Sequence, residues 1–319
     1  MTNTPLTVPD TADELVNAWA PLAQEALLQL QGHDACKFLQ GQTTADFGKA
    51  QTLDVIPGAF CDVKGRVIAD FRALIVDPEN IILCVMASLA DLLSTHLTKY
   101  LMFSKAELTR LPEPPWGVAG SEAHRHFDVD QKLLEGNRAV VLTQGWLIPL
   151  AHQTSLLIAK ETGQMAMNLN NKSLDEFESA WRALACLRGE ARVTSATTGK
   201  YLPQDLSYDL AGWVSFDKGC YTGQEIIARL HWRGTPKRRL YLGTATIKRP
   251  NEGVKLVSPT DARAVGSIVN AANHGNGSVI LVEAVESAAG QAVIIDEMNQ
   301  QKVTISDAPM GYFSSAETS

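Results

Sequence analysis

The sequence contains no run of about 20 apolar residues, the length that a membrane-spanning helix requires. Its five cysteines form no CxxC pair, which argues against a zinc ribbon or a thioredoxin-like site. Positive charge is also scarce, because 28 Lys and Arg face 35 Asp and Glu and leave a net charge of −7. That charge disfavours a general polyanion binder. Residues 1–13 have neither Lys, Arg nor an apolar run, so we expect no signal peptide. These absences predict a cytoplasmic protein with reduced thiols and no membrane partner.

The remaining composition, 45% hydrophobic and 20% charged over 319 residues, is typical of a globular protein of two or three domains. In the first third, apolar runs with strand character alternate with segments of helical spacing. We predict strands over 26–30, 55–61, 67–76 and 81–86, and helices over 13–20, after Asp34 (as a cap) and over 88–100. Strands packed against helices in this way indicate an α+β fold.

A proline-rich segment at 111–115 marks a plausible boundary. Short strands are predicted beyond it at 116–119, 139–143 and 155–159. Ser173 to Leu187 predicts a helix, because Ser173 and Glu176 have the spacing of a capping box ahead of an apolar face. After Arg239, evenly spaced short strands between Gly and Asn turns predict a small antiparallel sheet or barrel.

The segment 215–225 holds the densest group of reactive side chains. Lys218 and Cys220 lie among glycines that permit tight turns, and Thr222 is placed to cap a helix that starts shortly after it. A cysteine beside a lysine and just before a helix N-terminus favours the thiolate. The other four cysteines lie in or beside apolar runs, and we expect them in the core.

Five basic residues gather within eleven positions, namely Arg229, Arg233, Lys237, Arg238 and Arg239. In an acidic chain this cluster could bind a polyglutamate tail, a phosphate or an RNA backbone. A solvated helix face leading into a linker explains it equally well.

Other candidate residues are less specific. The segment 62–66 reads as a hairpin tip, and 41–46 as a backbone cradle or a helix-ending turn. His124 and His126 have no obvious third ligand, so we interpret them as solvated loop histidines and predict no metal site. Trp181 lies on the apolar face of its helix, where it could be core or could stack on a flat heterocycle.

The octapeptide Lys218-Gly-Cys-Tyr-Thr-Gly-Gln-Glu225 resembles the signature of the YgfZ family, which is related to the T-protein of the glycine cleavage system. Six further segments resemble family motifs in the expected order: 38–46, 61–66, 100–105, 181–184, 202–204 and 233–239. The resemblance implies an aminomethyltransferase-like ring of three domains around a central folate channel. We place an N-terminal α+β folate-binding part at 1–110, a second α+β domain at 111–234 and a C-terminal β-barrel at 235–319.

The same resemblance implies binding of tetrahydrofolate or a one-carbon derivative, and a role in tRNA modification and in maintaining iron–sulfur enzymes. Cys220 is then the functional thiol, with Lys218 assisting it, and Trp181 contacts folate. Further cofactor contacts are expected from Gln204, Tyr221, Gln224, Glu225 and Arg229. One position departs from the family, because Glu25 stands where a second folate-contacting tryptophan is expected, and the nearest tryptophan is Trp19.

Whether the chain is an enzyme stays open at this point. A folate-dependent transferase and a non-catalytic adaptor for iron–sulfur cluster assembly both agree with the motif. A true aminomethyltransferase is a further alternative, but the Cys220 motif argues against it, because that chemistry needs no cysteine nucleophile. Iron–sulfur assembly or client proteins are therefore expected partners. The acidic charge predicts that tRNA is an indirect or weak partner.

Overall fold

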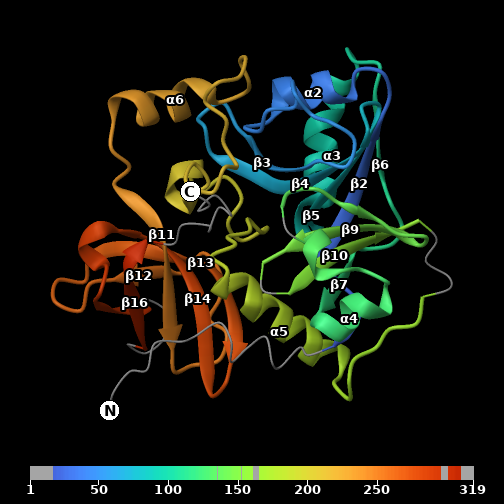
Figure 1. The fold of residues 1–319 in the computed structure, drawn as a ribbon. Helices are drawn as coiled ribbons and strands as arrows, with labels where there is room; N and C mark the ends of the chain where they lie inside the picture. The colour runs from blue at the N-terminus through green and yellow to red at the C-terminus, as the bar shows by residue number, and fades with distance from the viewer. Residues whose placement is uncertain (1–16, 135, 152, 161–164, 296–300, 310–319) are drawn as a thin grey trace.

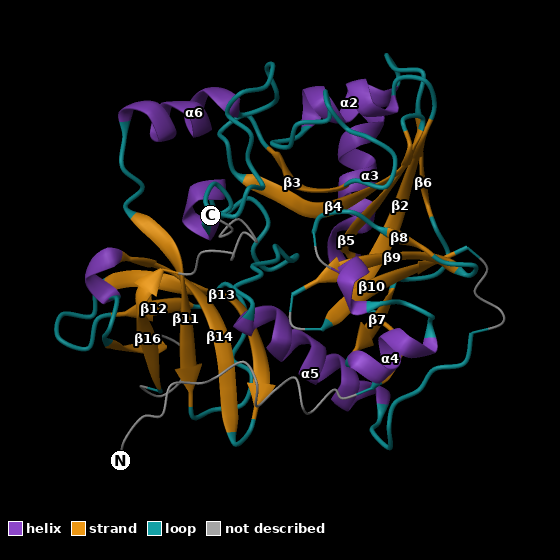
Figure 2. Ribbon diagram, viewed as in Figure 1, coloured by secondary structure: helices purple, strands orange, loops and turns teal. Residues whose placement is uncertain are grey.

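The computed structural model describes residues 17–134, 136–151, 153–160, 165–295 and 301–309. Two five-stranded antiparallel sheets and a closed barrel make up most of this part of the chain. Figure 2 shows the barrel on one side, the two sheets on the other, and helix α5 running between them. The α+β fold with a C-terminal antiparallel barrel is therefore confirmed.

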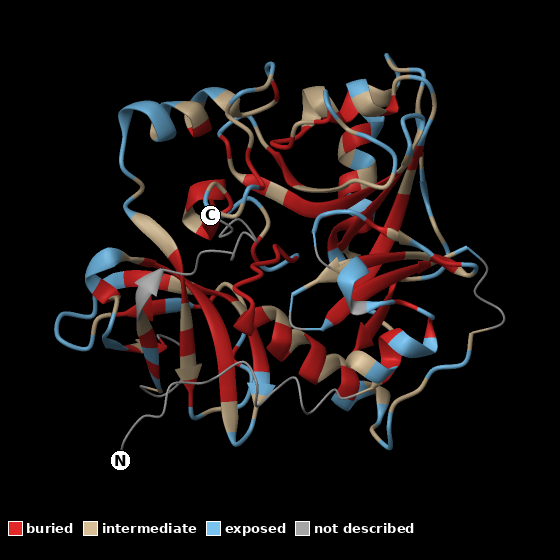
Figure 3. Ribbon diagram, viewed as in Figure 1, coloured by how far each residue is buried: buried red, intermediate tan, exposed pale blue. Residues whose placement is uncertain are grey.

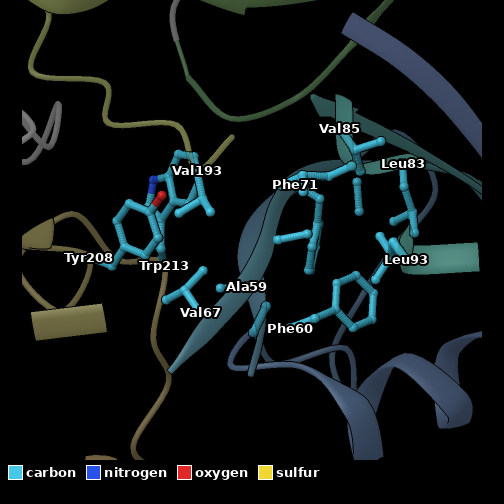
Figure 4. Close-up of a cluster of buried hydrophobic side chains, with 14 of the residues drawn as sticks. Ala59, Phe60, Val67, Phe71, Leu83, Val85, Leu93, Val193, Tyr208 and Trp213 are labelled. Atoms are coloured by element: carbon cyan, nitrogen blue, oxygen red, sulfur yellow. The ribbon is translucent and has the colours of Figure 1, made fainter. Parts of the chain in front are cut away.

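The first sheet has the strand order β3-β4-β5-β2-β6. Its strands are β3 (Val55–Cys61), β4 (Val67–Asp77), β5 (Asn80–Met86), β2 (Glu25–Gln31) and β6 (Glu107–Arg110). Helices α2 (Ala35–Gln42) and α3 (Ala87–Leu101) contribute to the core on one face of it. Phe60, Phe71 and Leu83 fill this core, and Tyr208 and Trp213 join it from a later segment (Figure 4). The predicted strands of this region are confirmed, whereas β6 was not predicted.

The second sheet has the order β1-β7-β10-β9-β8. Its strands are β1 (Ala18–Pro21), β7 (Trp116–Ala119), β10 (Thr154–Ala159), β9 (Gly145–Leu150) and β8 (Val140–Val141). The short helices α4 (Ser121–His126) and η2 (Gln131–Leu134) follow β7 in the chain. The first strand in sequence thus pairs with a strand almost a hundred residues later.

The helix predicted over 13–20 is wrong where the structure describes it, because Ala18–Pro21 form strand β1. Ala18 and Ala20 belong to one core cluster, while Trp19 belongs to another on the opposite face. Both faces of β1 are buried, so its apolar residues do not alternate with polar ones as in a half-exposed strand. Leu15 and Val16, on which the helical spacing also rested, lie outside the described residues.

Helix α5 (Leu174–Leu187) confirms the prediction from the capping box. Ser173 Oγ accepts from the backbone N–H of Glu176, and the Glu176 carboxylate accepts from the N–H of Ser173. Asp34 does not cap α2 through its side chain, because its carboxylate accepts the backbone N–H of Lys105 instead. The two residues of the capping box are three positions apart, so the sequence reveals it. Lys105, the partner of Asp34, is distant in the chain, so the sequence does not.

The barrel closes in the order β11-β14-β13-β12-β15-β16. Its strands are β11 (Arg238–Ala245), β14 (Gly277–Val285), β13 (Ala264–His274), β12 (Lys255–Val257), β15 (Ala292–Ile295) and β16 (Lys302–Pro309), with η4 (Glu286–Ala288) between β14 and β15. Two elements lie ahead of it in the chain, η3 (Pro203–Leu206) and α6 (Gln224–Arg233). Within the described ranges, no helix combines the length and the apolar character that crossing a membrane would require.

Candidate functional site

The octapeptide 218–225 packs against the hairpin tip 62–66, which joins β3 to β4. Gly223 adopts φ +83°, and a Cβ there would lie 2.4 Å from the carbonyl oxygen of Asp62. Gly65 on the hairpin has φ +74°, and a Cβ there would lie 3.2 Å from the Ile227 side chain. Only glycine permits this close approach of two backbones. The hairpin tip, which the sequence suggested was merely a turn, therefore supports the motif.

Gly223 is also the N-cap residue of α6, and it provides no side-chain hydrogen bond. The prediction that Thr222 caps this helix is wrong. The left-handed backbone that the contact with Asp62 requires places a glycine, not a threonine, at the cap position.

Cys220 is the exposed cysteine of the chain. Cys61, Cys84 and Cys186 are buried, and Cys36 is partly buried. Burial raises the pKa of all four of these thiols, to about 12 for Cys186, so they resist ionisation at neutral pH. The prediction that the other cysteines lie in the core is confirmed for three of them, and Cys220 is the thiol that a substrate or partner can reach.

Lys218 anchors the octapeptide to the segment that ends α2. Its Nζ lies 2.8 Å from the carbonyl oxygens of Gln40 and Thr43, and it also donates to the carbonyl of Ala45. Burial lowers the pKa of Lys218 to about 8, while the carboxylate of Asp46 opposes this shift. An ammonium has three N–H groups, and these three carbonyls occupy all of them. We therefore assign Lys218 to positioning the Cys220 loop rather than to hydrogen bonding with its thiol.

Replacing Lys218 by methionine is expected to lower the free energy of unfolding by about 1–2 kcal/mol, because buried carbonyls lose a charged donor. Urea denaturation measures the change. Lys37→Met, at an exposed position of α2, is the matched control and should change stability by less than about 0.5 kcal/mol. Equal losses in the two variants would contradict the anchoring role.

The other predicted cofactor contacts lie on this loop, on α6 or packed against α6. Tyr221 is buried beneath the Lys218 ammonium, 5.0 Å from Nζ to the ring centre, and burial raises its pKa. Gln204 is fully buried and donates from Nε2 to the carbonyl of Ile227 in α6. Gln224 and Glu225 form the first turn of α6, and Arg229 is exposed one turn further on.

Trp181 lies in a different part of the molecule. It belongs to α5, which Figure 1 shows well apart from α6. A small pocket beside it, of about 50 Å³, lies at the junction of the first sheet, α5 and barrel strand β13. No residue of 218–225 lines this pocket. The structure therefore does not bring Cys220 and Trp181 together, although sequence reasoning had placed them around one ligand.

Six buried charged side chains gather beside this pocket. They are Glu25, Asp70, Arg72, Arg188, Glu190 and Arg192. Glu190 pairs with Arg72 at 2.7 Å and with Arg188 at 3.1 Å. Burial works against its ionisation, but Arg72, Arg188 and Arg192 together lower the pKa of Glu190 to about 2. Three acids and three bases balance one another, which allows charges to be buried at all.

Arg192 connects the two other acids of this cluster. Its Nε donates to Asp70 at 2.5 Å, and Nη1 lies 3.5 Å from the Glu25 carboxylate. Glu25, the position that departs from the family, also accepts the thiol proton of Cys84 at 2.7 Å. The sequence signal that could have indicated the cluster is the charged pattern Arg188-Gly-Glu-Ala-Arg192 directly after an amphipathic helix.

Trp19, the tryptophan nearest in sequence to Glu25, lies on the second sheet and does not line the pocket at Trp181. It stacks on His126 at 4.3 Å and borders a separate hollow of about 680 Å³, which none of the predicted site residues line. The interpretation of His124 as a solvated histidine is wrong. It is buried, with its ring nitrogens 2.9 Å from the carbonyl of Gly120 and from Ser155 Oγ.

No protein-family model matches the chain, but curated proteins and a solved structure are similar to it. The "tRNA-modifying protein YgfZ" of Escherichia coli O127:H6 is 30% identical over 269 residues, which is 80% of this chain and 81% of that protein. The chain belongs to the YgfZ family. YgfZ proteins of Yersinia enterocolitica (28% identity, 94% of each chain) and Pectobacterium atrosepticum (29%, 92% of this chain and 88% of that protein) are similar over still longer ranges.

A solved structure supports the fold of this YgfZ-family chain. The glycine cleavage system aminomethyltransferase T of Bartonella henselae superposes with a TM-score of 0.68, covering 96% of this chain and 90% of that one. At 13% sequence identity, this similarity shows the shared fold. The resemblance read from the octapeptide is thus confirmed for the family and for the aminomethyltransferase-like fold.

Proposed function

We propose that this protein supports tRNA modification, and with it the maintenance of iron–sulfur enzymes, through the thiol of Cys220 in the cytoplasm. The observation that carries this proposal is the exposure of Cys220 on a loop that Lys218 and two glycine contacts hold in place. The name of the relatives, tRNA-modifying protein YgfZ, supports the choice of tRNA modification as the process.

The chemistry available at this site is that of an accessible thiol. A thiolate is the nucleophile in covalent catalysis by cysteine, and it also exchanges with sulfur bound to another protein. Lys218 ties the loop to the segment that ends α2, Tyr221 is buried beneath the same ammonium, and Gln204 holds the helix α6 that follows, so the exposed thiol sits on a supported loop. Both a transferase and an adaptor for cluster assembly could use such a thiol, and both require Cys220 itself.

A reduced folate is the proposed ligand of the pocket at Trp181. The buried Nη2 of Arg192 has no hydrogen-bond partner within the described chain, and the Glu252 carboxylate, which accepts from Thr194 Oγ1, lines the same pocket. This set of donors and acceptors fits the polar edge of a pterin, which has both kinds of group. When bound, a reduced folate supplies a one-carbon unit.

The space enclosed beside Trp181 is smaller than a folate requires. About 50 Å³ holds one or two water molecules, whereas pockets for drug-sized ligands enclose about 300–1,000 Å³. Trp181 is itself only 2% exposed, with Phe177 stacked at 6.1 Å and the Arg188 guanidinium at 5.7 Å from its ring. We therefore propose that folate binding includes an opening of this junction, most directly by side chains at its rim such as Met86 and Arg182.

Calorimetric titration with tetrahydrofolate tests this ligand. Ala185 lines the pocket from α5 and is partly exposed, so Ala185→Phe can fill the space without replacing a core residue. We expect saturable binding to the native protein and a loss of about tenfold or more, about 1.4 kcal/mol, in Ala185→Phe. Ala185→Ser is the matched control, because its side chain is too small to block the pocket. The absence of binding to the native protein, or equal binding to all three, would contradict the folate proposal.

A further inference from the structure

Helix α6 packs only weakly against the rest of the chain. Ile227 is its one buried residue, whereas α5 buries seven. Figure 3 shows α6 largely exposed beside the buried strands and α5. Trp232, near the end of α6, is 67% exposed, which is unusual for so large an apolar side chain. A surface helix normally buries its apolar residues, so the second half of α6 presents a face that the described chain does not cover.

Three aromatic rings meet on this face. Phe216, from the loop before the octapeptide, stacks on His231 with ring centres 3.6 Å apart and planes 11° from parallel. Trp232 stands edge-on to both, 4.6 Å from His231 and 6.5 Å from Phe216. The stacking of Phe216 on His231 joins the loop to the helix, so the three rings form one aromatic surface on the outside of the molecule.

The free positive charges of the region belong to α6 and to the segment that follows it. Of the five clustered basic residues, Arg238 pairs with Glu283 and Arg239 pairs with Asp209. The other three, Arg229, Arg233 and Lys237, are exposed and form no ion pair with any part of the chain that the structure describes. Nearby acids are Asp217, on the loop, and Glu225, at the opposite end of α6. The second half of α6 is thus positive in a protein whose net charge is −7.

We propose that this α6 surface, made of Phe216, His231, Trp232 and the three free basic residues, binds unpaired bases of an RNA strand. Exposed aromatic rings stack on bases and neighbouring cations contact phosphates, which is how single-stranded nucleic acid is bound without a groove for a duplex. The inference rests on the proposed function in tRNA modification and names the surface that would contact the RNA. Cys220 precedes the same helix, and Trp232 lies about 12 Å along it from Gln224, so a strand of a few nucleotides would span both.

Fluorescence anisotropy with a labelled single-stranded RNA of about 12 nucleotides, and with the matching duplex, tests the surface. We expect the native protein to prefer the single strand and to release it as salt rises. Trp232→Ala should weaken binding about tenfold, since one stacked base contributes about 1–3 kcal/mol. Arg233→Glu should also weaken it and reduce the salt dependence. Lys160→Glu makes the same change of charge at an exposed lysine directly after β10 and should have no effect.

The outcomes separate this inference from the proposed function. No RNA binding by the native protein, a preference for the duplex, or binding that Trp232→Ala leaves intact would overturn the α6 surface. If tRNA modification in cells then still required Cys220, the proposed function would stand without it. Since Trp232 is exposed, its replacement should leave thermal unfolding unchanged, and a folded variant that has lost RNA binding supports the inference.

Discussion

Replacing Cys220 by alanine is expected to abolish the proposed contribution of this protein to tRNA modification, with no measurable loss of stability. Cys220 is exposed, and substitutions at exposed positions without special contacts change stability by less than about 0.5 kcal/mol. The thiol is nevertheless the reactive group that the loop holds in place, so its removal leaves nothing that can perform the chemistry. Cys220→Ser should be equally inactive, because a serine hydroxyl does not ionise at neutral pH.

Modified nucleosides of tRNA, measured by mass spectrometry in cells whose own copy is deleted, give the readout. Cys36→Ser is the control, because it removes another thiol that is at least partly accessible and lies outside the octapeptide. Normal modification with Cys220→Ala would disprove the proposed function. Loss of folding in that variant would instead show that Cys220 has a structural role.

The same variant distinguishes an enzyme from an adaptor. If Cys220 is a docking contact, oxidation should trap a mixed disulfide between the native protein and an iron–sulfur assembly protein, and Cys220→Ala should not form it. If Cys220 is a nucleophile, prior alkylation should inactivate the protein, and bound substrate should protect it from alkylation. The four less accessible thiols should react more slowly, because burial raises their pKa.

The sequence could predict an element where the residues that determine it lie close together in the chain. The helix at 174–187 and the three strands between 55 and 86 were found because capping and periodicity act within a few residues. Strand β1 was missed because its partner β7 lies almost a hundred residues away and because its two faces are buried in two different core clusters. The octapeptide identified the family, but its support by Gly65 and by the carbonyls that end α2 is visible only in three dimensions.

The central charged cluster was beyond sequence analysis for the same reason. Glu25, Asp70 and Arg192 come from strand β2, strand β4 and the segment after α5, and each alone resembles an ordinary surface residue. Glu25 was noticed as a departure from the family, yet the sequence could not indicate what replaces the tryptophan. The structure shows that Glu25 is a buried carboxylate within an ionic network.

Replacing Arg192 by methionine is expected to lower the free energy of unfolding by about 3–5 kcal/mol, because Asp70 and Glu25 would remain buried without their cation. Urea denaturation measures this loss. Arg110→Met removes the exposed pair with Asp91 and should cost less than about 1 kcal/mol. Such a large loss is a substantial share of the stability of an ordinary domain. The variant is therefore expected to accumulate poorly in cells, without any direct effect on the Cys220 loop.

The pH dependence of stability gives an independent test of the cluster. The folded-state pKa of Glu190, about 2, lies below the value of about 4.3 for an unfolded chain. Its contribution is therefore fully present above pH 4.3 and is lost as the pH falls toward 2, where the folded protein must also take up the proton. Removing Arg72 takes away one of the interactions that lower this pKa, so the pKa of Glu190 in folded Arg72→Met lies closer to the unfolded value. The variant should therefore be less stable at neutral pH, but it should lose less further stability than the native protein as the pH falls toward 2. If the native protein and Arg72→Met lose the same amount of stability over this acid range, and Arg192→Met costs no more than Arg110→Met, the buried charges do not depend on one another.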